Sequence, residues 1–420
     1  METMQDLDTT MCVVMDLSLV DLAASLYHFL RRRSKELPRM EPECLLMDRI
    51  SNLPSSLVQT ILTLMPIRDA FRTSILSRNW RHRCVNLPKL EFDDRLLSIY
   101  SQLSIKCKVV HAIYTVLLLH RGPVLEFSLC VSQLPSCCEI DQIIMHLANN
   151  TTVEKFNLVI GLGHSAAYKL PSSFFSLKRL THINLKNCVV QLQSTSFRFE
   201  RLTSLCFHNV SITNKMLICF ISCCPILKSL TLIGEEKHFV GSDQYSALVQ
   251  LFQLLPLIEH LEMNCCPVKC FTSGVIPQSL PNKLVHLRAL VLHGLSFGKE
   301  DELRFVLLLV TSSPNLKKIK MEMTYSSTEA ISQTAMNLFD LQNYSNVKLD
   351  HLHDLEITNF SNMKPGMDFL KLILAKSFML KKVRVVINNN ISVNDEVKML
   401  RDLLWNPCAS AGAQIKVERA

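Results

Sequence analysis

The sequence predicts an α/β fold in which a small module of three short helices precedes a long solenoid of strand–helix turns. The strands are expected to run parallel on the inner curve, with the helices outside. One observation is a short apolar motif that recurs between residues 96 and 385, and another is a set of helix start and stop signals in residues 48–90. A third is the scarcity of glycine, with 10 among 420 residues. A doubly wound α/β domain is the alternative, but its glycine-rich turns and irregular spacing do not fit this chain.

Residues 48–90 contain the signals for three helices. Asn52 is a candidate N-cap and Pro54 lies in the first turn. Pro66 ends this helix, and Asp69 lies near the start of the second, where its charge suits the helix dipole. Ser77 is a candidate cap for a third helix. A module this small needs a partner surface to bury its apolar residues. Those expected on its inner faces are Val58, Ile61, Leu62, Met65, Ile67, Ala70 and Phe71.

The order of residues in this module resembles the F-box in the form common in plant proteins. One departure is Cys84, where relatives often carry a second tryptophan. The resemblance implies docking on a Skp1-type adaptor, which joins a cullin and hence a ubiquitin-conjugating enzyme. The alternative is a helical subdomain packed against the rest of the chain. The matching residues are Leu53-Pro54, Ile61-Leu62, Leu64-Met65-Pro66, Asp69-Ala70, Arg72-Thr73-Ser74, Leu76-Ser77-Arg78 and Trp80-Arg81. The residues expected to contact the adaptor are Leu53, Pro54, Leu57, Ile61, Leu62, Pro66, Leu76 and Trp80.

A repeat follows the helical module. Its clearest copies begin at Pro225, Pro256 and Pro314, with apolar residues two, five and seven positions later. Apolar helical runs precede them at 218–221, 251–255 and 303–310, and proline separates helix from strand because it cannot continue a helix. Steps of about 22 to 36 residues are typical of irregular leucine-rich repeats. The final triplet recurs as Leu180-Ile183-Leu185, Leu202-Leu205-Phe207, Leu287-Leu290-Leu292, Leu352-Leu355-Ile357 and Leu380-Val383-Val385, with weaker copies ending at Leu129 and Leu158.

The strand residues between and after the buried leucines are expected to face outward. These outward positions mix charged, polar and apolar residues without a stripe of one sign, which favours recognition of a folded protein over nucleic acid. An ordinary solvated strand position is the alternative for each of them, Val386 included. The residues expected to contact a substrate protein are Lys186, His208, Glu262, Asn264, His293, Lys320 and Glu322.

The C-terminal segment resembles the FBD region that follows leucine-rich repeats in many plant F-box proteins. It departs from relatives at residues 406–410, where they favour a different turn. We expect it to continue the strand–helix alternation and to cap the last repeat. The expected regions are an amphipathic or disordered extension (1–47), the F-box (48–95), leucine-rich repeats (96–350) and the FBD region (351–420). The motifs are Leu352-x-x-Leu355-x-Ile357-x-x-Phe360, Phe369-Leu370-x-x-Ile373-Leu374-Ala375, Leu380-Lys381-Lys382-Val383 and Ala413-Gln414-Ile415-Lys416-Val417.

Charge and cysteine content exclude several classes of function. The net charge is +8, and both attraction to an acidic partner and a merely solvated basic surface are open interpretations. The basic residues are not interleaved with aromatic residues, so nucleic acid is not an expected partner. Sixteen cysteines without a C-x-x-C pair indicate buried free thiols in a reducing compartment, although Cys266 and Cys270 are spaced to share a metal. We expect no bound metal and no cofactor.

Residues 11–30 are apolar but contain Asp16 and Asp21, and arginines follow the stretch instead of preceding it. A signal peptide or membrane span is therefore not expected, and the nucleus and/or cytoplasm is the expected location. G-x-G-x-x-G, Walker A and H-E-x-x-H motifs are absent. The expected function is a non-catalytic substrate receptor of a Skp1-cullin-F-box ubiquitin ligase, which acts by proximity. A non-ligase interaction scaffold is the first alternative, and an enzyme is the last.

Overall fold

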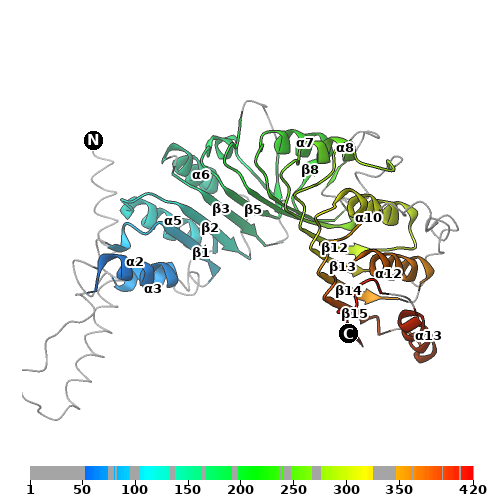
Figure 1. Cartoon of the computed structure of the whole chain (residues 1–420). Helices are drawn as coiled ribbons and strands as arrows, with labels where there is room; N and C mark the ends of the chain where they lie inside the picture. Colours follow the sequence, from blue (N-terminus) through cyan, green and yellow to red (C-terminus); the bar gives the residue numbers. More distant parts are fainter. Residues whose placement is uncertain are drawn as a thin grey trace, which may run out of the picture. The chain divides into compact units, whose positions relative to one another are not determined.

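The computed structural model divides into two units, Met1–Pro54 and Ser55–Ala420, and Figure 1 draws the described residues in colour. Leu53 and Pro54 are described from the first unit, and the architecture below is that of the second. The expectations for residues 1–47, Asn52, Leu76, Ser77 and Cys270 lie outside the described residues. These are 53–73, 80, 83–94, 105–132, 138–150, 152–161, 167–191, 197–235, 239–240, 247–266, 276–324, 347–361, 363–389, 391–405 and 408–419.

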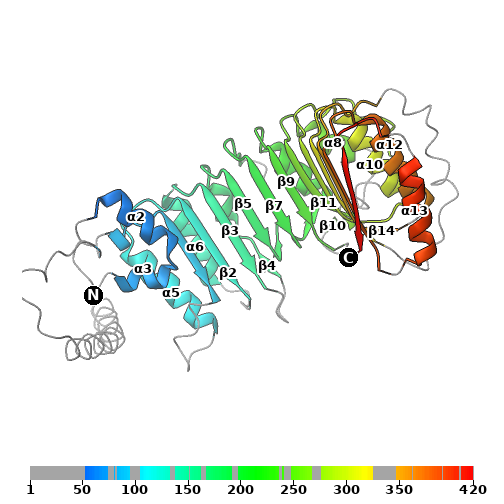
Figure 2. The same ribbon diagram turned by 60° about the horizontal axis from the view of Figure 1, so that its bottom comes forward.

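A twelve-stranded parallel sheet runs through the second unit (Figure 2). Each strand pairs in parallel with the next long strand along the chain, without the reversal of order that marks a doubly wound sheet. The solenoid prediction is therefore confirmed. In sheet order the strands are β1 (Lys89–Asp93), β2 (Glu126–Val131), β3 (Lys155–Ile160), β5 (His182–Lys186), β7 (Ser204–His208), β9 (Ser229–Ile233), β11 (His260–Asn264), β12 (Ala289–Leu295), β13 (Lys318–Met323), β14 (Asp354–Phe360), β15 (Lys382–Ile387) and β16 (Gln414–Arg419).

Helices from α6 onward lie along one side of this sheet (Figures 1 and 2). The runs expected before Pro225, Pro256 and Pro314 correspond to α7, α8 and α10. One turn, between β3 and β5, instead contains the short 3-10 helix η3 (Ser172–Ser176), which follows Pro171 and inserts Phe174 into the core. The helices are α2 (Ser55–Leu64), α3 (Ile67–Thr73), α5 (Ile105–Leu119), α6 (Cys138–Asn150), α7 (Asn214–Ser222), α8 (Ala247–Gln253), α10 (Glu300–Ser312), α12 (Lys364–Lys376) and α13 (Val393–Trp405).

Two short two-stranded pairs accompany the main sheet, β4 (Tyr168–Lys169) with β6 (Cys188–Val189) and β8 (Ile212–Thr213) with β10 (Phe239–Val240). Within the described ranges, no helix has the length and apolar character needed to cross a lipid bilayer.

The core lies between the sheet and the helices. Every apolar triplet expected from the repeats is buried there, in register with its neighbours, as in the pairing of Leu230 with Leu261. Phenylalanine rings continue from one turn to the next in the N-terminal half, with successive ring centroids 5.1–6.1 Å apart. The pairs include stacked, tilted and edge-to-face contacts, which add to the free energy of burial. The rings belong to Phe92, Phe127, Phe156, Phe174, Phe199 and Phe220.

Asparagines at the carboxyl ends of the strands join adjacent turns. Asn187, Asn209 and Asn359 have φ of 59°, 51° and 57°, a left-handed conformation that asparagine tolerates better than most residues. The Asn359 side chain donates to the carbonyl of Met323 at 2.6 Å. The register of β14 with β15 shifts just before this level, and Val386, expected to face outward, is buried there.

The sheet spans the boundaries expected from the sequence. β1 lies inside the range expected for the F-box, with Leu90 and Phe92 buried, and it pairs with β2 of the repeat region. β13 and β14 pair across residue 351, where the FBD region was expected to begin. The helical module, the repeats and the C-terminal segment therefore share one continuous sheet.

Candidate protein-interaction sites

The F-box-like helices have a small apolar interior. Val58 and Leu62 lie one turn apart on α2 and are buried, and Trp80 is buried as well. Cys84 is fully buried, and its thiol donates to the carbonyl oxygen of Ala70 at 3.0 Å. Burial raises the pKa of this thiol above its ordinary value, so Cys84 acts as a small apolar residue.

A second apolar stripe on α2 is exposed. Its members are Leu57, Ile61 and Leu64, which we call the α2 stripe, with 51%, 40% and 82% of their surfaces accessible. They lie at positions i, i+4 and i+7 and so share one side of the helix. A row of exposed apolar side chains along one side of a helix is a candidate interaction surface.

The eight residues expected to contact an adaptor divide into three groups. Leu57, Ile61 and the two prolines, Pro54 and Pro66, are exposed, and Leu53 is half-buried. Leu62 and Trp80 are buried in the interior of the module, whereas direct contact with an adaptor was expected. Leu62 is buried because its side of α2 packs inside the module. Leu76 lies outside the described residues. The expectation omitted Leu64, which its spacing from Leu57 could have revealed.

The sheet surface opposite the helices brings three of the expected substrate contacts together. The imidazole of His293 on β12 lies between the carboxylates of Glu262 on β11 and Glu322 on β13. Its Nε2 is 3.0 Å from one carboxylate oxygen and its Nδ1 is 3.0 Å from the other. Ionised carboxylates only accept, so both contacts are hydrogen bonds when both ring nitrogens carry protons.

Lys186 and His208 are direct register partners on β5 and β7. The pKa of His208 lies below its ordinary value, mainly because burial disfavours the charged ring and also because Lys186 is close. Lys186, His208 and His293 lie toward the carboxyl ends of their strands. The remaining pair is engaged elsewhere: Asn264 bonds both backbone groups of Gly234, and Lys320 lies 3.6 Å from a Glu356 oxygen.

Uncharged residues also lie on this surface, on both sides of Glu262, a feature the sequence-based selection overlooked. Cys206, Thr231, Ile233 and Val291 lie on β7, β9 and β12 and are half-buried. Glu262 on β11 lies in register between Thr231 and Val291. Ion pairs lie further along the sheet on β13–β16, where Arg384 contacts both Glu356 and Glu418. A surface that mixes apolar, polar and charged side chains in this way can form a protein–protein interface.

Two of the described thiols in this part of the chain are unreactive. Burial raises the pKa of Cys188 to about 12 and that of Cys206 to about 11, so both thiols stay protonated at neutral pH. Within the described part of the chain, no three His, Cys, Asp or Glu side chains are grouped to hold a metal ion. The geometry therefore suits binding, by apolar, polar and charged contacts.

Comparison with known proteins identifies two regions of the chain. Residues 50–92 match the F-box domain model, and residues 140–255 match the model "FBD-associated F-box protein At5g56370, LRR repeats". F-box/FBD/LRR-repeat protein At1g13570 of Arabidopsis thaliana is 30% identical over 414 residues, covering 88% of this chain and 98% of the relative. This chain belongs to the plant F-box/FBD/LRR-repeat family.

A second relative of this F-box/FBD/LRR-repeat protein is FBD-associated F-box protein At5g56370 of Arabidopsis thaliana, 24% identical with 88% and 99% of the two chains covered. A third, F-box/FBD/LRR-repeat protein At2g04230 of the same plant, is 30% identical over 44% of this chain and 42% of its own length. An F-box domain in general indicates binding of a Skp1-type adaptor. The α2 stripe lies within the matched F-box, and Glu262, His293 and Glu322 lie on strands that continue beyond the matched repeats.

Proposed function

We propose that this protein is the substrate-recognition subunit of a Skp1-cullin-F-box E3 ubiquitin ligase. The observation that carries the proposal is the α2 stripe, an exposed apolar row within the matched F-box domain. Docking of a Skp1-type adaptor would remove Leu57, Ile61 and Leu64 from water, which is favourable in proportion to the apolar area covered. Pro54 and Pro66, also exposed, flank this helix.

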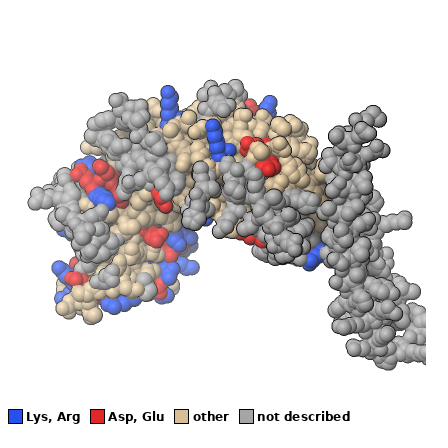
Figure 3. All heavy atoms as spheres, turned by 180° about the vertical axis from the view of Figure 1, so that it is seen from behind, with Lys and Arg blue, Asp and Glu red and all other residues tan. Residues whose placement is uncertain are grey.

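The sheet surface is the proposed site for the target protein. Its uncharged residues, such as Ile233 and Val291, would supply apolar contacts, and the polar groups of His208 and His293 would give specificity. Charged side chains on the visible surface of the described residues are interspersed in sign, so no broad field of one sign selects nucleic acid (Figure 3). The protein would supply no catalytic group, because holding a target beside a conjugating enzyme raises the effective concentration of the two reactants.

The test is capture of partners in plant cells with and without a proteasome inhibitor. A tagged wild-type chain should retain a Skp1-type adaptor and a cullin, and at least one further partner should accumulate when proteolysis is blocked. A variant with serine at Leu57 and Leu64 should lose the adaptor and the cullin but keep that further partner. Retention of the adaptor without a cullin, and without any change in partner abundance, would instead support a non-ligase scaffold. We also propose the nucleus or cytoplasm as the location, which a fluorescent fusion tests directly.

A further inference from the structure

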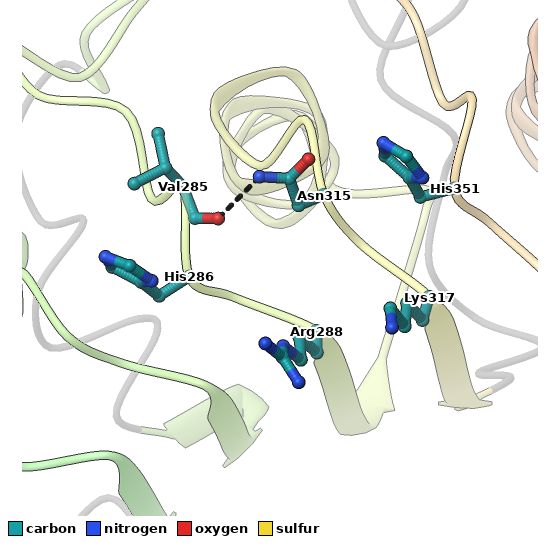
Figure 4. Close-up of a pocket in the computed structure, with 6 residues that line it drawn as sticks. All are labelled: Val285, His286, Arg288, Asn315, Lys317 and His351. Carbon is teal, nitrogen blue, oxygen red and sulfur yellow. Dashed lines mark hydrogen bonds between the residues drawn. The ribbon is translucent and has the colours of Figure 1, made fainter.

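A pocket of about 340 Å³ opens beside the amino ends of β12 and β13 (Figure 4). Its volume is at the lower end of the range of small-ligand sites. It lies at the opposite ends of the strands from His293 and Glu322, so it is separate from the proposed target surface. The residues that line it are Val285, His286, Arg288, Asn315, Lys317 and His351.

The repeat places the two cations of this pocket side by side. Arg288 and Lys317 each directly precede a strand, and the Lys317 amide donates to the Arg288 carbonyl at 2.8 Å. The next residues, Ala289 and Lys318, are direct register partners. Neighbouring strands lie only about 4.8 Å apart, so the two side chains start from adjacent points on one edge of the sheet. Figure 4 shows both beside the same opening, with His286 and His351 on its two sides.

The charge of this pair is not balanced by an ion pair. Some cations next to the sheet are paired, as Lys228 is with Glu259 at 2.9 Å and Lys320 with Glu356. Arg288 and Lys317 have no carboxylate within 4.0 Å among the residues that the structure describes, and no acidic residue lines the pocket.

The field of Arg288 acts on the carboxylate of Glu259. Its pKa is lowered first by its hydrogen bond from Lys228 and only secondarily by the field of Arg288. The Glu259 carboxylate is therefore already paired with Lys228. Like charges on adjacent strands repel, and a bound anion would convert that repulsion into attraction.

We propose that this pocket binds a phosphate group. The Arg288 guanidinium offers a planar fork of donors suited to phosphate, and the Lys317 ammonium adds three more. The imidazoles of His286 and His351 can donate further hydrogen bonds. The total number of donors suits the oxygens of a phosphate group better than the two oxygens of a carboxylate. Asn315 has a structural role, because its amide donates to the Val285 carbonyl at 2.8 Å and holds two adjacent turns together. The pocket lies at the opposite strand ends from His293, so its phosphate binding can be tested without an adaptor or a target protein.

The test is binding of pyrophosphate and of O-phosphoserine to the purified full-length chain, measured by titration calorimetry at constant ionic strength. Both Arg288→Ala and Lys317→Ala should weaken pyrophosphate binding roughly 10- to 100-fold, the loss expected for a hydrogen bond to a charged group. Both side chains are exposed, so neither substitution should alter the melting temperature in chloride buffer. Lys178→Ala is the matched control, because Lys178 is an exposed cation in the turn before β5 and should leave binding unchanged.

The two probes also distinguish a phosphorylated side chain of a partner from a small phosphate compound. Binding of both probes favours a phosphorylated side chain of a partner, whereas binding of pyrophosphate alone favours a small phosphate compound, and either supports the site. Absence of saturable binding to the wild-type chain, or equal weakening by Lys178→Ala, would overturn the proposal. Neither result depends on an adaptor or cullin, so failure here would leave the proposed ligase role untouched.

Discussion

Replacement of the α2 stripe by polar residues should abolish adaptor binding without unfolding the chain. Complete burial of a leucine or isoleucine side chain contributes roughly 1.5–3 kcal/mol. The exposed fractions are 51% for Leu57, 40% for Ile61 and 82% for Leu64. Scaled by these fractions, full coverage of the stripe would contribute roughly 3–5 kcal/mol in total. The triple serine variant should therefore bind a Skp1-type adaptor roughly 100- to 5,000-fold more weakly.

The assay is titration of the purified chain with a recombinant Skp1-type adaptor, alongside thermal unfolding followed by circular dichroism. Three serines on an exposed helix surface cost about 0.5 kcal/mol each in helix propensity, so the melting curve should shift only slightly. Leu118→Ser is a matched control, because Leu118 on α5 is 67% exposed and lies outside the matched F-box. Leu62→Ala is a second comparison: Leu62 is buried, and its truncation should destabilise the fold by about 2–5 kcal/mol.

Unchanged adaptor affinity in the triple variant would refute the assignment of the α2 stripe. So would an equal loss of affinity in Leu118→Ser, since that result would indicate nonspecific adhesion to exposed apolar groups. A loss of affinity that appears only together with unfolding would show that the stripe supports the fold instead of the interface.

Three further outcomes are expected. Phe156→Ala interrupts the row of phenylalanine rings and should lower the free energy of unfolding by about 3–5 kcal/mol in urea denaturation. Gly161→Ala should destabilise by about 1–3 kcal/mol in the same assay, because its Cβ would lie 1.8 Å from a backbone oxygen of Ser132. Burial lowers the pKa of His120 and His208 below 6.5, so the folded chain binds protons less readily than the unfolded chain. The free energy of unfolding should therefore be highest above about pH 6.5 and should decrease on acidification. This decrease should be shallower in His208→Gln.

The strands were predictable from sequence because each depends on a local signal. The triplet ending at Leu232 has the period of a strand, and Pro225 fixes where the preceding helix must stop. Helices α7, α8 and α10 follow from the same signal. β1 was not predicted as a sheet strand because Leu90 and Phe92 form too short a pattern to stand out beside the F-box motif. The phenylalanine row was also missed, since it depends on contacts between turns and not on spacing within one.

The binding surfaces were less predictable because the sequence does not say which contacts a side chain makes. Glu262, His293 and Glu322 were chosen as separate outward residues, and only the register of β11, β12 and β13 brings them into one chain of hydrogen bonds. Asn264 faces the same surface, yet both ends of its amide are used by Gly234. Outward position alone therefore overstates the number of residues available to a partner.

Helix α2 shows what decides between an interior and an interface. Leu57 and Val58 are adjacent apolar residues, as are Ile61 and Leu62, so the sequence offers two parallel stripes and no polar face to separate them. The interior takes the stripe of Val58 and Leu62, because Ile67 and Ala70 of α3 are buried with it. The α2 stripe is left on the surface, where polar residues would make the chain more soluble. Its apolar character is therefore unfavourable in a free chain. That cost is offset only when another surface covers the stripe, which is why the excess of apolar residues on α2 points to a partner.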